Sequence, residues 1–412
     1  MRFRRLQRLE WCRGVFAGKQ VRKSVFTLKA YVVYVKRCPR ESQRLDANSR
    51  TGSNRIYCSA DVKKGHPGSN DNYKDTLRSI LISPFEDYEV VRMLVREYMP
   101  GDEQEILKLF NVVFKRKLDL RLWNWRFVEN PCSKGIIRLM FDNQKLVGHY
   151  AVTPTPLWVK GKVYRAAFSM TTMTHPDYCG RGIFSQLASE VYGCCKAKGI
   201  KFVFGFPNEN SYHGFTQKLG WHGFGRVKGW AIEREPAHLP REHEFTYEEL
   251  RAFDKRVDDL WARARESNNI MVPRTADFIN WRYFQQPGGE YTVYGIRDRN
   301  SVLQGLLVLK VFIGRDETAG HIIDFLAPDQ LDIQQAILRK ATEFFAKKGV
   351  ANITCWIPSG SPIAAQLQAI GFSQKGWPTY SGVKVLDDAF EDISFVTDPC
   401  LWSFTMGDSD VF

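Results

Sequence analysis

The chain has 412 residues, of which 44% are apolar and 25% are charged, a globular composition with room for two or more domains. No apolar run is long enough to cross a membrane as a helix. The nine cysteines form no Cys-x-x-Cys pair, which argues against a zinc site and favours a reducing, cytoplasmic setting.

The net charge of +14 is concentrated in the first predicted region, residues 1–90. This region holds 19 Lys and Arg against 9 Asp and Glu, a net charge of +10, which leaves only +4 for the remaining chain. Residues 40–75 are rich in Ser, Asn, Gly and Asp, a composition typical of flexible segments. We interpret this region as a disordered or dispensable head, with a targeting segment or a nucleic-acid-binding arm as the alternative.

Ordered elements are predicted from residue 91 onward. We expect a helix over Asp102–Phe114, a strand around Gly148 and another strand over Ala166–Thr174. A loop carrying two glycines, Gly180 and Gly182, follows the second strand.

The segment after this loop predicts a helix and a further strand. Apolar residues recur at i, i+3 and i+4 over 183–195, and Gly199 stands where a C-cap glycine belongs. An apolar run, Phe202–Phe206, comes next. A strand, a glycine loop opening a helix and a second strand are a device for holding phosphate, because the backbone N–H groups and the helix dipole both favour an anion.

The order of these parts resembles the GNAT acyltransferases, the superfamily of coenzyme-A-dependent N-acetyltransferases. The family hallmark is Arg/Gln-x-x-Gly-x-Gly/Ala before a helix, then a strand, an Asn and a helix that ends in Leu-Gly-Phe. The corresponding segments are Cys179–Phe184, Phe202–Phe206, Asn208 or Asn210, and Leu219-Gly220-Trp221. The chain departs from the hallmark at its first position, Cys179, and at its last, Phe184.

This resemblance, which covers residues 91–233, implies a substrate and the residues that bind it. The donor would be acetyl-CoA or another acyl-CoA, with no metal, and the acceptor a small-molecule amine. The coenzyme-binding residues would be Met173, Thr174, Cys179, Gly180, Arg181, Gly182, Ile183, Phe184, Asn208 and Asn210. Backbone amides of the loop would grip the pyrophosphate, and those near Met173 and Thr174 would polarise the thioester carbonyl.

Three side chains are the candidates for proton transfer. Many family members carry a Glu on the fourth strand as base and a Tyr in a later helix as acid, but here that strand reads Ser-Met-Thr-Thr-Met-Thr. Tyr212 is the candidate acid, with packing in a helix as its alternative role. His149, on a predicted strand, and Glu209, after the fifth strand, are candidates to accept a proton or orient the amine.

An internal repeat predicts a second, similar half. Asn124-Trp125-Arg126-Phe127 recurs 156 residues later as Asn280-Trp281-Arg282-Tyr283, and Leu219-Gly220-Trp221 has its counterpart in Ile370-Gly371-Phe372. In the second copy a strand, His321–Leu326, leads to a helix over Asp332–Lys348 without a Gly-x-Gly loop. We therefore expect a half that no longer binds coenzyme, and a structural role for the repeated Trp-Arg pair.

The predicted fold class is α/β (α+β), with two tandem GNAT-like domains, each a mixed, mostly antiparallel twisted sheet flanked by helices. The first domain spans 91–234, a linker 235–246, the degenerate domain 247–388 and a C-terminal tail 389–412. We expect a helix over Tyr247–Glu266 to open the second domain. Trp402 and Phe404 alternate at strand period, which predicts a strand in the tail that packs on a sheet.

The leading hypothesis is an acyl-CoA-dependent N-acyltransferase, most simply an N-acetyltransferase, acting on a small amine or amino-sugar. One alternative is a non-catalytic GNAT-like binding or scaffold protein. Another is aminoacyl transfer from aminoacyl-tRNA, as in the Fem-type relatives with paired halves. That reaction needs a basic groove, and the charge of +4 outside the head argues against it, so we expect no nucleic-acid partner.

Overall fold

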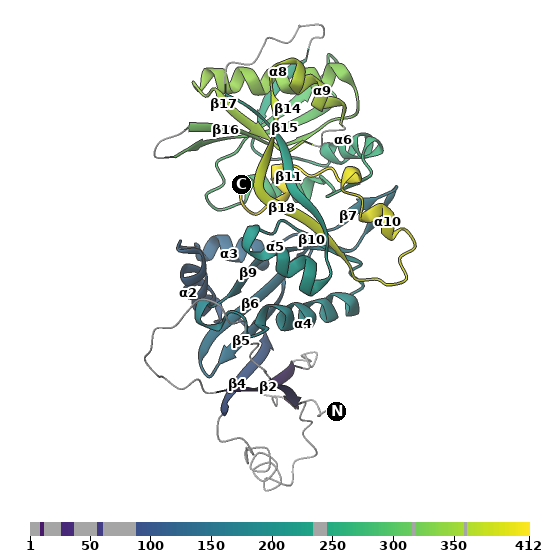
Figure 1. The fold of residues 1–412 in the computed structure, drawn as a ribbon. Coiled ribbons are helices and arrows are strands. Elements are labelled where there is room, and N and C mark those ends of the chain that lie inside the picture. Colours follow the sequence, from purple (N-terminus) through teal and green to yellow (C-terminus); the bar gives the residue numbers. More distant parts are fainter. Residues whose placement is uncertain are drawn as a thin grey trace, which may run out of the picture. The chain divides into compact units, whose positions relative to one another are not determined.

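The computed structural model describes residues 9–11, 26–36, 56–60, 88–233, 245–314, 318–357 and 361–412 (Figure 1). Most of the predicted linker and most of the predicted head lie outside these residues. Contacts divide the chain into two compact units. Unit 1 comprises Met1–Arg116, Ile137–Tyr150 and Met173–Leu187, and unit 2 comprises Lys117–Ile136, Ala151–Thr172 and Ala188–Phe412. These bounds differ from those of the predicted domains, which stay a prediction.

Unit 1 is built on strands in the order β1-β2-β4-β5-β6, with β3 beside β2. Their bounds are β1 (Leu9–Trp11), β2 (Phe26–Lys36), β3 (Ile56–Ala60), β4 (Tyr88–Glu97), β5 (Ile136–Asp142) and β6 (Lys145–Pro154). The predicted helix is confirmed as α2 (Glu103–Phe114), which begins after its N-cap residue Asp102. Asp102 also accepts two hydrogen bonds of 2.6 Å from the Arg96 guanidinium on β4, which ties the start of the helix to the sheet.

Unit 2 begins with α3 (Leu120–Phe127), which is capped by Asp119, and continues through elements on both sides of the glycine loop. These elements are β7 (Leu157–Val159), β8 (Lys162–Tyr164), β9 (Ala166–Thr174), α4 (Ile183–Ala197), β10 (Phe202–Gly205), α5 (Glu209–His213) and β11 (His222–Ile232). A π-helical turn, Gly214–Lys218, follows α5. Strand β6, strand β9 and helix α4 each contribute residues to both units.

The remaining elements of unit 2 repeat much of this order. They are β12 (Thr246–Leu250), α6 (Arg256–Ala264), β13 (Ile270–Met271), α7 (Ala276–Ile279), β14 (Thr292–Arg297), β15 (Leu303–Ile313), β16 (Thr318–Leu326), α8 (Leu331–Lys347), β17 (Asn352–Cys355), α9 (Pro362–Ala369) and β18 (Ser373–Val385). A π-helical turn, Asn280–Phe284, follows α7, as one follows α5.

The sheet of unit 2 runs in the order β6-β9-β10-β18-β11-β17-β16-β15-β14-β12. Strand pairs β9–β10 and β16–β17 are parallel, whereas β10–β18, β11–β18, β11–β17, β15–β16, β14–β15 and β12–β14 are antiparallel. The prediction of a mixed, mostly antiparallel sheet flanked by helices is therefore confirmed.

Helix α8 covers part of this sheet and makes much of its core. Its residues Ile333, Ile337, Ala341 and Phe345 are spaced by four and are all buried, so one face of the helix is apolar. This face packs on β14, β15 and β16, with α9 beside it, as Figure 1 shows.

Two local predictions are wrong. Residues Thr246–Leu250 form strand β12 paired antiparallel with β14, and the helix begins only at Arg256, so no helix spans 247–266. Trp402 and Phe404 do not form a strand, because the chain there makes short 3₁₀ turns, Pro399–Leu401 and Met406–Asp408. Trp402 is nevertheless buried and makes an isolated bridge with Ile270 of β13.

Corresponding positions of the repeat share backbone conformations that L-residues rarely adopt. Gly199, after α4, has φ +71° and Gly349, after α8, has φ +67°. Gly220 and Gly371, in the two motifs that end the predicted copies, have φ +65° and +102°. Such values favour glycine, because a Cβ atom would crowd the backbone.

Candidate active site

Strand β9 runs past the end of its parallel neighbour β10. The two strands pair from Ala166 with Phe202 to Ser169 with Gly205, where β10 ends. The last five residues of β9 therefore extend beyond β10, up to Thr174. Two parallel strands that part in this way leave one backbone edge available for an extended ligand to pair with.

The backbone of β9 is distorted just after the parting. Thr171 has φ +54°, a conformation that is rare for any residue but glycine and strained for a β-branched one. Such strain costs roughly 1–3 kcal/mol and gathers at functional sites. The sequence carries no signal for it, because threonine is an ordinary strand residue.

The predicted phosphate loop joins β9 to α4. Gly180 and Gly182 have φ +74° and +79°, and a Cβ atom built on Gly180 would meet nothing within 4 Å. Helix α4 begins at Ile183 with no acidic residue in its first turn. The first N–H groups of a helix lack an intrahelical acceptor, so this open, glycine-lined helix start fits an anionic phosphate.

Side chains around Tyr178 hold this loop in place. The Tyr178 hydroxyl donates a 2.7 Å hydrogen bond to Asp142 of β5, and burial together with this bond raises the pKa of Tyr178 to about 12. The Arg181 guanidinium lies over the Tyr178 ring at 4.5 Å and donates to the Asp177 carbonyl at 3.1 Å. The His175 side chain accepts a hydrogen bond from the Asp177 amide and so starts the turn.

The start of α4 rests directly on β6 at Gly148. A Cβ atom at this position would lie 2.5 Å from Ile183 Cγ2 and 2.9 Å from Leu187 Cδ1. Glycine is therefore required for the helix to approach the strand this closely. The position of the glycine loop before α4 thus depends on Gly148.

The candidates after β10 lie at the start of α5 in unit 2. Asn208 is the N-cap of α5 and accepts a 3.1 Å hydrogen bond from the Ser211 amide. Glu209 is exposed and pairs with Arg226 at 3.1 Å, and Asn210 is also exposed.

Tyr212, the candidate acid, is held by an aromatic neighbour and by a close glycine. Its ring stacks on Tyr380 at 4.2 Å, and its hydroxyl oxygen accepts a 3.2 Å hydrogen bond from the Gly225 amide. A Cβ atom at Gly223 would lie 2.2 Å from that oxygen, so the glycine makes room for the hydroxyl. The hydroxyl proton remains available for donation, because the oxygen acts as acceptor in this bond.

His149 lies on β6 and is fully buried at 0% exposure. A side chain so enclosed does not reach solvent, where an amine would first meet the protein. Its catalytic role stays a prediction.

A cavity of about 40 Å³, here called the tryptophan cavity, lies in unit 2. It is lined by Trp125, Arg126, Thr153, Thr155, Phe168, Met170, Phe204, Val272, Phe278, Trp281, Arg282, Gln286, Gly407, Asp408, Ser409, Asp410 and Phe412. Both copies of the repeated Trp-Arg pair are in this lining. The repeat was the sequence signal that singled out the two Trp-Arg pairs. The cavity itself could not be predicted, because its lining residues are far apart along the chain.

The two tryptophans contact each other reciprocally. Their rings stack at 4.3 Å with an interplanar angle of 14°. Trp125 Nε1 donates to the Trp281 carbonyl at 2.9 Å, and Trp281 Nε1 donates to the Trp125 carbonyl at 3.1 Å. The structural role that we expected for the repeated pair thus takes the form of a symmetric contact.

The C-terminal tail forms one wall of the cavity, and two arginines hold it in place by hydrogen bonds. Arg126 donates to the Asp410 carbonyl at 2.9 Å, and Arg282 donates to the carbonyls of Gly407 and Ser409 at 3.0 and 3.1 Å. The tail therefore has a fixed conformation at the cavity.

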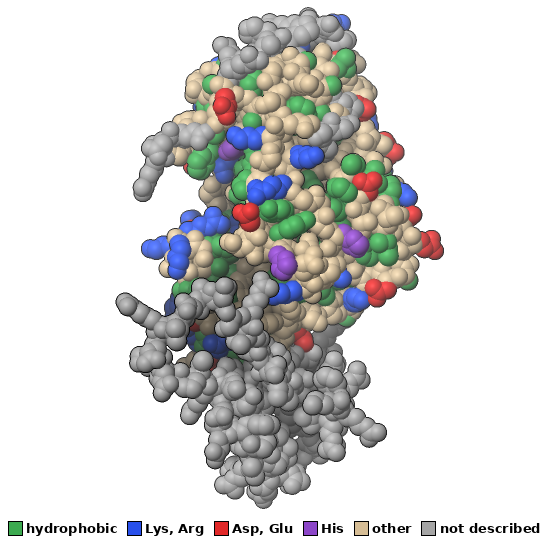
Figure 2. Space-filling model, in the orientation of Figure 1, with side chains coloured by type: hydrophobic (Ala, Val, Ile, Leu, Met, Phe, Trp, Pro, Cys, Tyr) green, Lys and Arg blue, Asp and Glu red, His purple; other side chains and the backbone are tan. Residues whose placement is uncertain are grey.

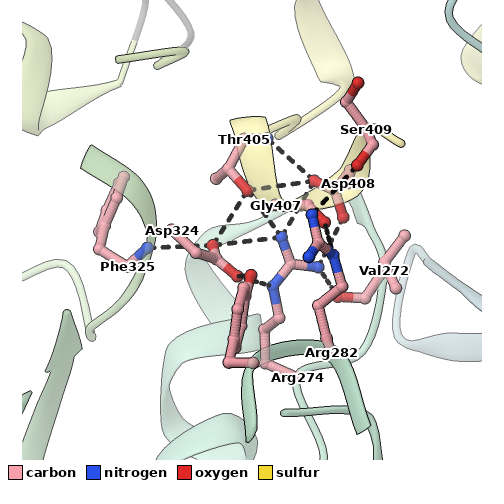
Figure 3. A network of polar contacts seen from close by, with 10 residues as sticks. Val272, Arg274, Arg282, Asp324, Phe325, Thr405, Gly407, Asp408 and Ser409 are labelled. Carbon is pink, nitrogen blue, oxygen red and sulfur yellow. Dashed lines mark hydrogen bonds and ion pairs between the residues drawn. The ribbon is translucent and has the colours of Figure 1, made fainter. Parts of the chain in front are cut away.

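A buried ion network supports the same wall (Figure 3). Arg274, at 0% exposure, donates to Asp324 at 2.7 Å and to Asp408 at 2.8 Å, and also to the Thr405 hydroxyl at 2.9 Å. The Tyr283 hydroxyl donates to Asp324 as well. One cation thus joins β16 to the tail through two buried carboxylates.

The described ranges contain neither a metal-binding cluster nor a membrane-spanning helix. In these ranges no three His, Cys, Asp or Glu side chains are grouped so that they could hold a metal ion. No helix in the same part of the chain is long and apolar enough to span a membrane.

Comparisons with known proteins agree with this geometry. Residues 94–223 match the family model of the GNAT acetyltransferase domain. No curated protein matches the chain.

Among solved structures, the chain is similar to a probable N-acyltransferase of unknown function from Enterococcus faecalis V583, at 12% identity and a TM-score of 0.59 over 71% of this chain and 72% of that one. It is also similar to GCN5-related N-acetyltransferases from Anabaena variabilis ATCC 29413 (14% identity, TM-score 0.59, 72% and 73% covered) and Kribbella flavida (13%, 0.52, 72% and 71%). At these identities the likeness shows a shared fold. The family-model match identifies residues 94–223 as a GNAT acetyltransferase domain, so the chain carries an acyltransferase domain.

Proposed function

We propose that the chain is an acyl-CoA-dependent N-acyltransferase, most simply an N-acetyltransferase, that acts on a small amine or amino-sugar. The amine nitrogen attacks the thioester carbonyl carbon, the C–S bond breaks, and coenzyme A leaves as a thiol. The amine gives up one proton and the thiolate takes one, so the reaction balances without an oxidant.

The observation that carries this proposal is the loop at the start of α4. Gly180 and Gly182 both adopt positive φ, and no acidic side chain stands in the first turn of the helix. Backbone amides in such a loop can approach a pyrophosphate closely, and the helix dipole adds to the attraction. We propose that residues 179–184 bind the pyrophosphate of the coenzyme, with Cys179 and Phe184 contributing main-chain groups.

The part of β9 beyond β10 is our candidate for the acyl arm. Its backbone, including Met173 and Thr174, would pair with the pantetheine amides as a neighbouring strand does, and an N–H group would polarise the thioester carbonyl. The positive φ of Thr171 distorts the strand backbone at this place. Tyr212 would donate a proton to the leaving thiolate, with Asn208 and Asn210 near the start of its helix.

We place the amine in the tryptophan cavity. Phe168 and Met170, which belong to the part of β9 in unit 2, line it. Its volume of about 40 Å³ admits an amino group and a few neighbouring atoms. The Asp410 carboxylate in its lining, which lies 4.0 Å from the Arg126 guanidinium, is our candidate to meet an ammonium group. Glu209, which lies in the first turn of α5 and pairs with Arg226, would accept a proton or orient the amine.

Substitution of Gly180 by Asp tests the proposal. The new carboxylate repels a pyrophosphate, and positive φ adds a backbone strain of about 1–2 kcal/mol. The matched control is Gly161→Asp, because Gly161 also has positive φ (+83°) and open space around its Cβ position. We expect calorimetry to show acetyl-CoA binding in the wild type and in Gly161→Asp, and at least a tenfold loss in Gly180→Asp.

Turnover separates the catalytic proposal from its alternatives. Release of free coenzyme A thiol in the presence of amines and amino-sugars supports the transferase. Coenzyme binding without turnover across the panel favours a non-catalytic binding protein. Absence of coenzyme binding in the wild type contradicts the proposal and leaves the scaffold and the aminoacyl-tRNA alternatives. Transfer from aminoacyl-tRNA needs a basic surface, whereas the face drawn in Figure 2 carries acidic as well as basic side chains.

A further inference from the structure

A second cavity lies in unit 2 where β16 extends past β17. These strands pair from Ala319 with Asn352 to Ile322 with Cys355, where β17 ends, and β16 continues to Leu326. A cavity of about 210 Å³ lies beyond this parting, and we call it the β16 cavity. It shares no lining residue with the tryptophan cavity.

One side chain in the lining is buried and has an acceptor oxygen that receives no hydrogen bond from the described residues. Gln334, in the first turn of α8, is 6% exposed. Its Nε2 donates a 3.0 Å hydrogen bond to Asp329 Oδ1, which fixes the orientation of the amide. Its Oε1 accepts no hydrogen bond from any residue in the described ranges. A buried acceptor of this kind is costly to leave without a donor, so a water molecule or a ligand in the cavity must supply one.

The charge of the lining selects the kind of donor. Asp329 is exposed at the start of α8 and belongs to the lining, whereas no Lys, Arg or His is among the described residues that line the cavity. A phosphate or carboxylate ligand would meet the Asp329 carboxylate without a compensating cation in the lining, so the site favours a neutral or cationic ligand.

Apolar side chains complete the lining and set the shape of the ligand. Phe325, Leu326, Ile363 and Phe404 all face the cavity. A cavity of about 150 Å³ between such side chains is large enough for benzene, so about 210 Å³ accepts a ring with one polar substituent.

We propose that the β16 cavity is a second ligand site, for a small molecule that joins a primary ammonium group to a short apolar group. The ammonium donates hydrogen bonds to Gln334 Oε1 and to the carboxylate of Asp329, and the apolar group contacts the side chains that complete the lining. The ligand binds without covalent change. This site does not depend on coenzyme binding by the loop before α4.

Benzylamine is the first probe, with benzyl alcohol and benzoate as its neutral and anionic counterparts. Dissociation constants are measured by ligand-observed NMR titration of the full chain without coenzyme. The test variant is Gln334→Met, which keeps the size of the side chain and removes the acceptor. The matched control is Gln335→Met on the same helix, because Gln335 bonds to Gln366 and does not line the cavity.

We expect benzylamine to bind more tightly than either counterpart and Gln334→Met to weaken its binding by about tenfold or more. Gln335→Met leaves binding unchanged, and Gln334→Glu strengthens it through the added charge. Three outcomes would overturn the proposal: no binding of benzylamine, equal binding of benzoate, or equal binding in wild type and Gln334→Met. The last outcome would place the amine at another site, including the proposed acceptor site. Equal melting curves of the two Met variants exclude misfolding as the cause of a loss.

Discussion

Replacement of Arg274 by methionine would remove the cation from the buried ion network. The guanidinium is fully buried and forms ion pairs with Asp324 at 2.7 Å and Asp408 at 2.8 Å. Both carboxylate side chains are only 1% exposed, so water cannot take the place of the lost donors. Methionine fills a similar volume but supplies no hydrogen bond.

The size of the effect follows from this burial. Removal of one partner of a buried ion pair costs about 3–5 kcal/mol, because the remaining charge stays desolvated. Two carboxylates lose their partner here, so we expect the upper part of that range. For a unit of this size, such a loss lowers the melting temperature by about 10 °C.

The loss should depend on pH. Burial raises the pKa of the Asp408 carboxyl in the wild-type protein, and Arg274 acts in the opposite direction. Without Arg274 the folded-state pKa rises further above the unfolded value of about 4. The penalty is therefore largest near pH 7. It declines as the pH falls below the raised folded-state pKa, and it is gone only below the unfolded value of about 4, where both states are protonated.

Urea unfolding at pH 7 and at pH 5 measures both effects. The control is Arg297→Met, because Arg297 pairs with the exposed Glu248, at 55% exposure, and should contribute at most about 1 kcal/mol. We expect Arg274→Met to lose several kcal/mol more than the control at pH 7, and part of this difference to vanish at pH 5. Equal losses in the two variants would refute the reasoning from burial.

Three further predictions test packing and ionisation. Gly148→Ala would place a Cβ atom 2.5 Å from Ile183, so we expect it to lower the free energy of unfolding by about 1–3 kcal/mol and to weaken coenzyme binding. The control is Gly305→Ala, whose nearest contact is 3.2 Å and which should cost less than about 1 kcal/mol. Urea unfolding measures the stability of both variants, and calorimetry measures their coenzyme affinity. Because the pKa of Tyr178 is raised to about 12, the contribution of its hydroxyl to the stability of the fold is complete below pH 10 and is lost as the pH rises towards 12. In an absorbance titration, Tyr178→Phe should therefore show one late-ionising tyrosine fewer than the wild type. Trp281→Phe removes one reciprocal hydrogen bond and part of the ring stack, with an expected loss of about 2 kcal/mol in urea unfolding, and a loss below 0.5 kcal/mol would contradict the packing role.

Local patterns in the sequence predicted the elements around the phosphate loop. The observed β9 is the predicted strand, Ala166–Thr174, and the helix begins at Ile183 directly after the two glycines. Both signals are short-range, because glycine permits positive φ and a repeating apolar pattern defines a buried helix face. The prediction of the GNAT family came from the same residues.

Features that depend on distant partners were not predicted. Tyr247 and Leu250 are three residues apart, as on a helix face, but their segment pairs with β14 and becomes a strand. The positive φ of Thr171 depends on how β9 leaves its neighbour, which no local pattern encodes. The two cavities combine segments far apart in the chain, so only the three-dimensional structure could reveal them.

The contact between Trp125 and Trp281 has the symmetry of an interface between two identical subunits. Each residue gives its partner the same hydrogen bond that it receives, which is the geometry of an isologous interface. Here both partners belong to one chain, so the contact forms at any protein concentration, whereas the same contact between separate subunits would weaken on dilution.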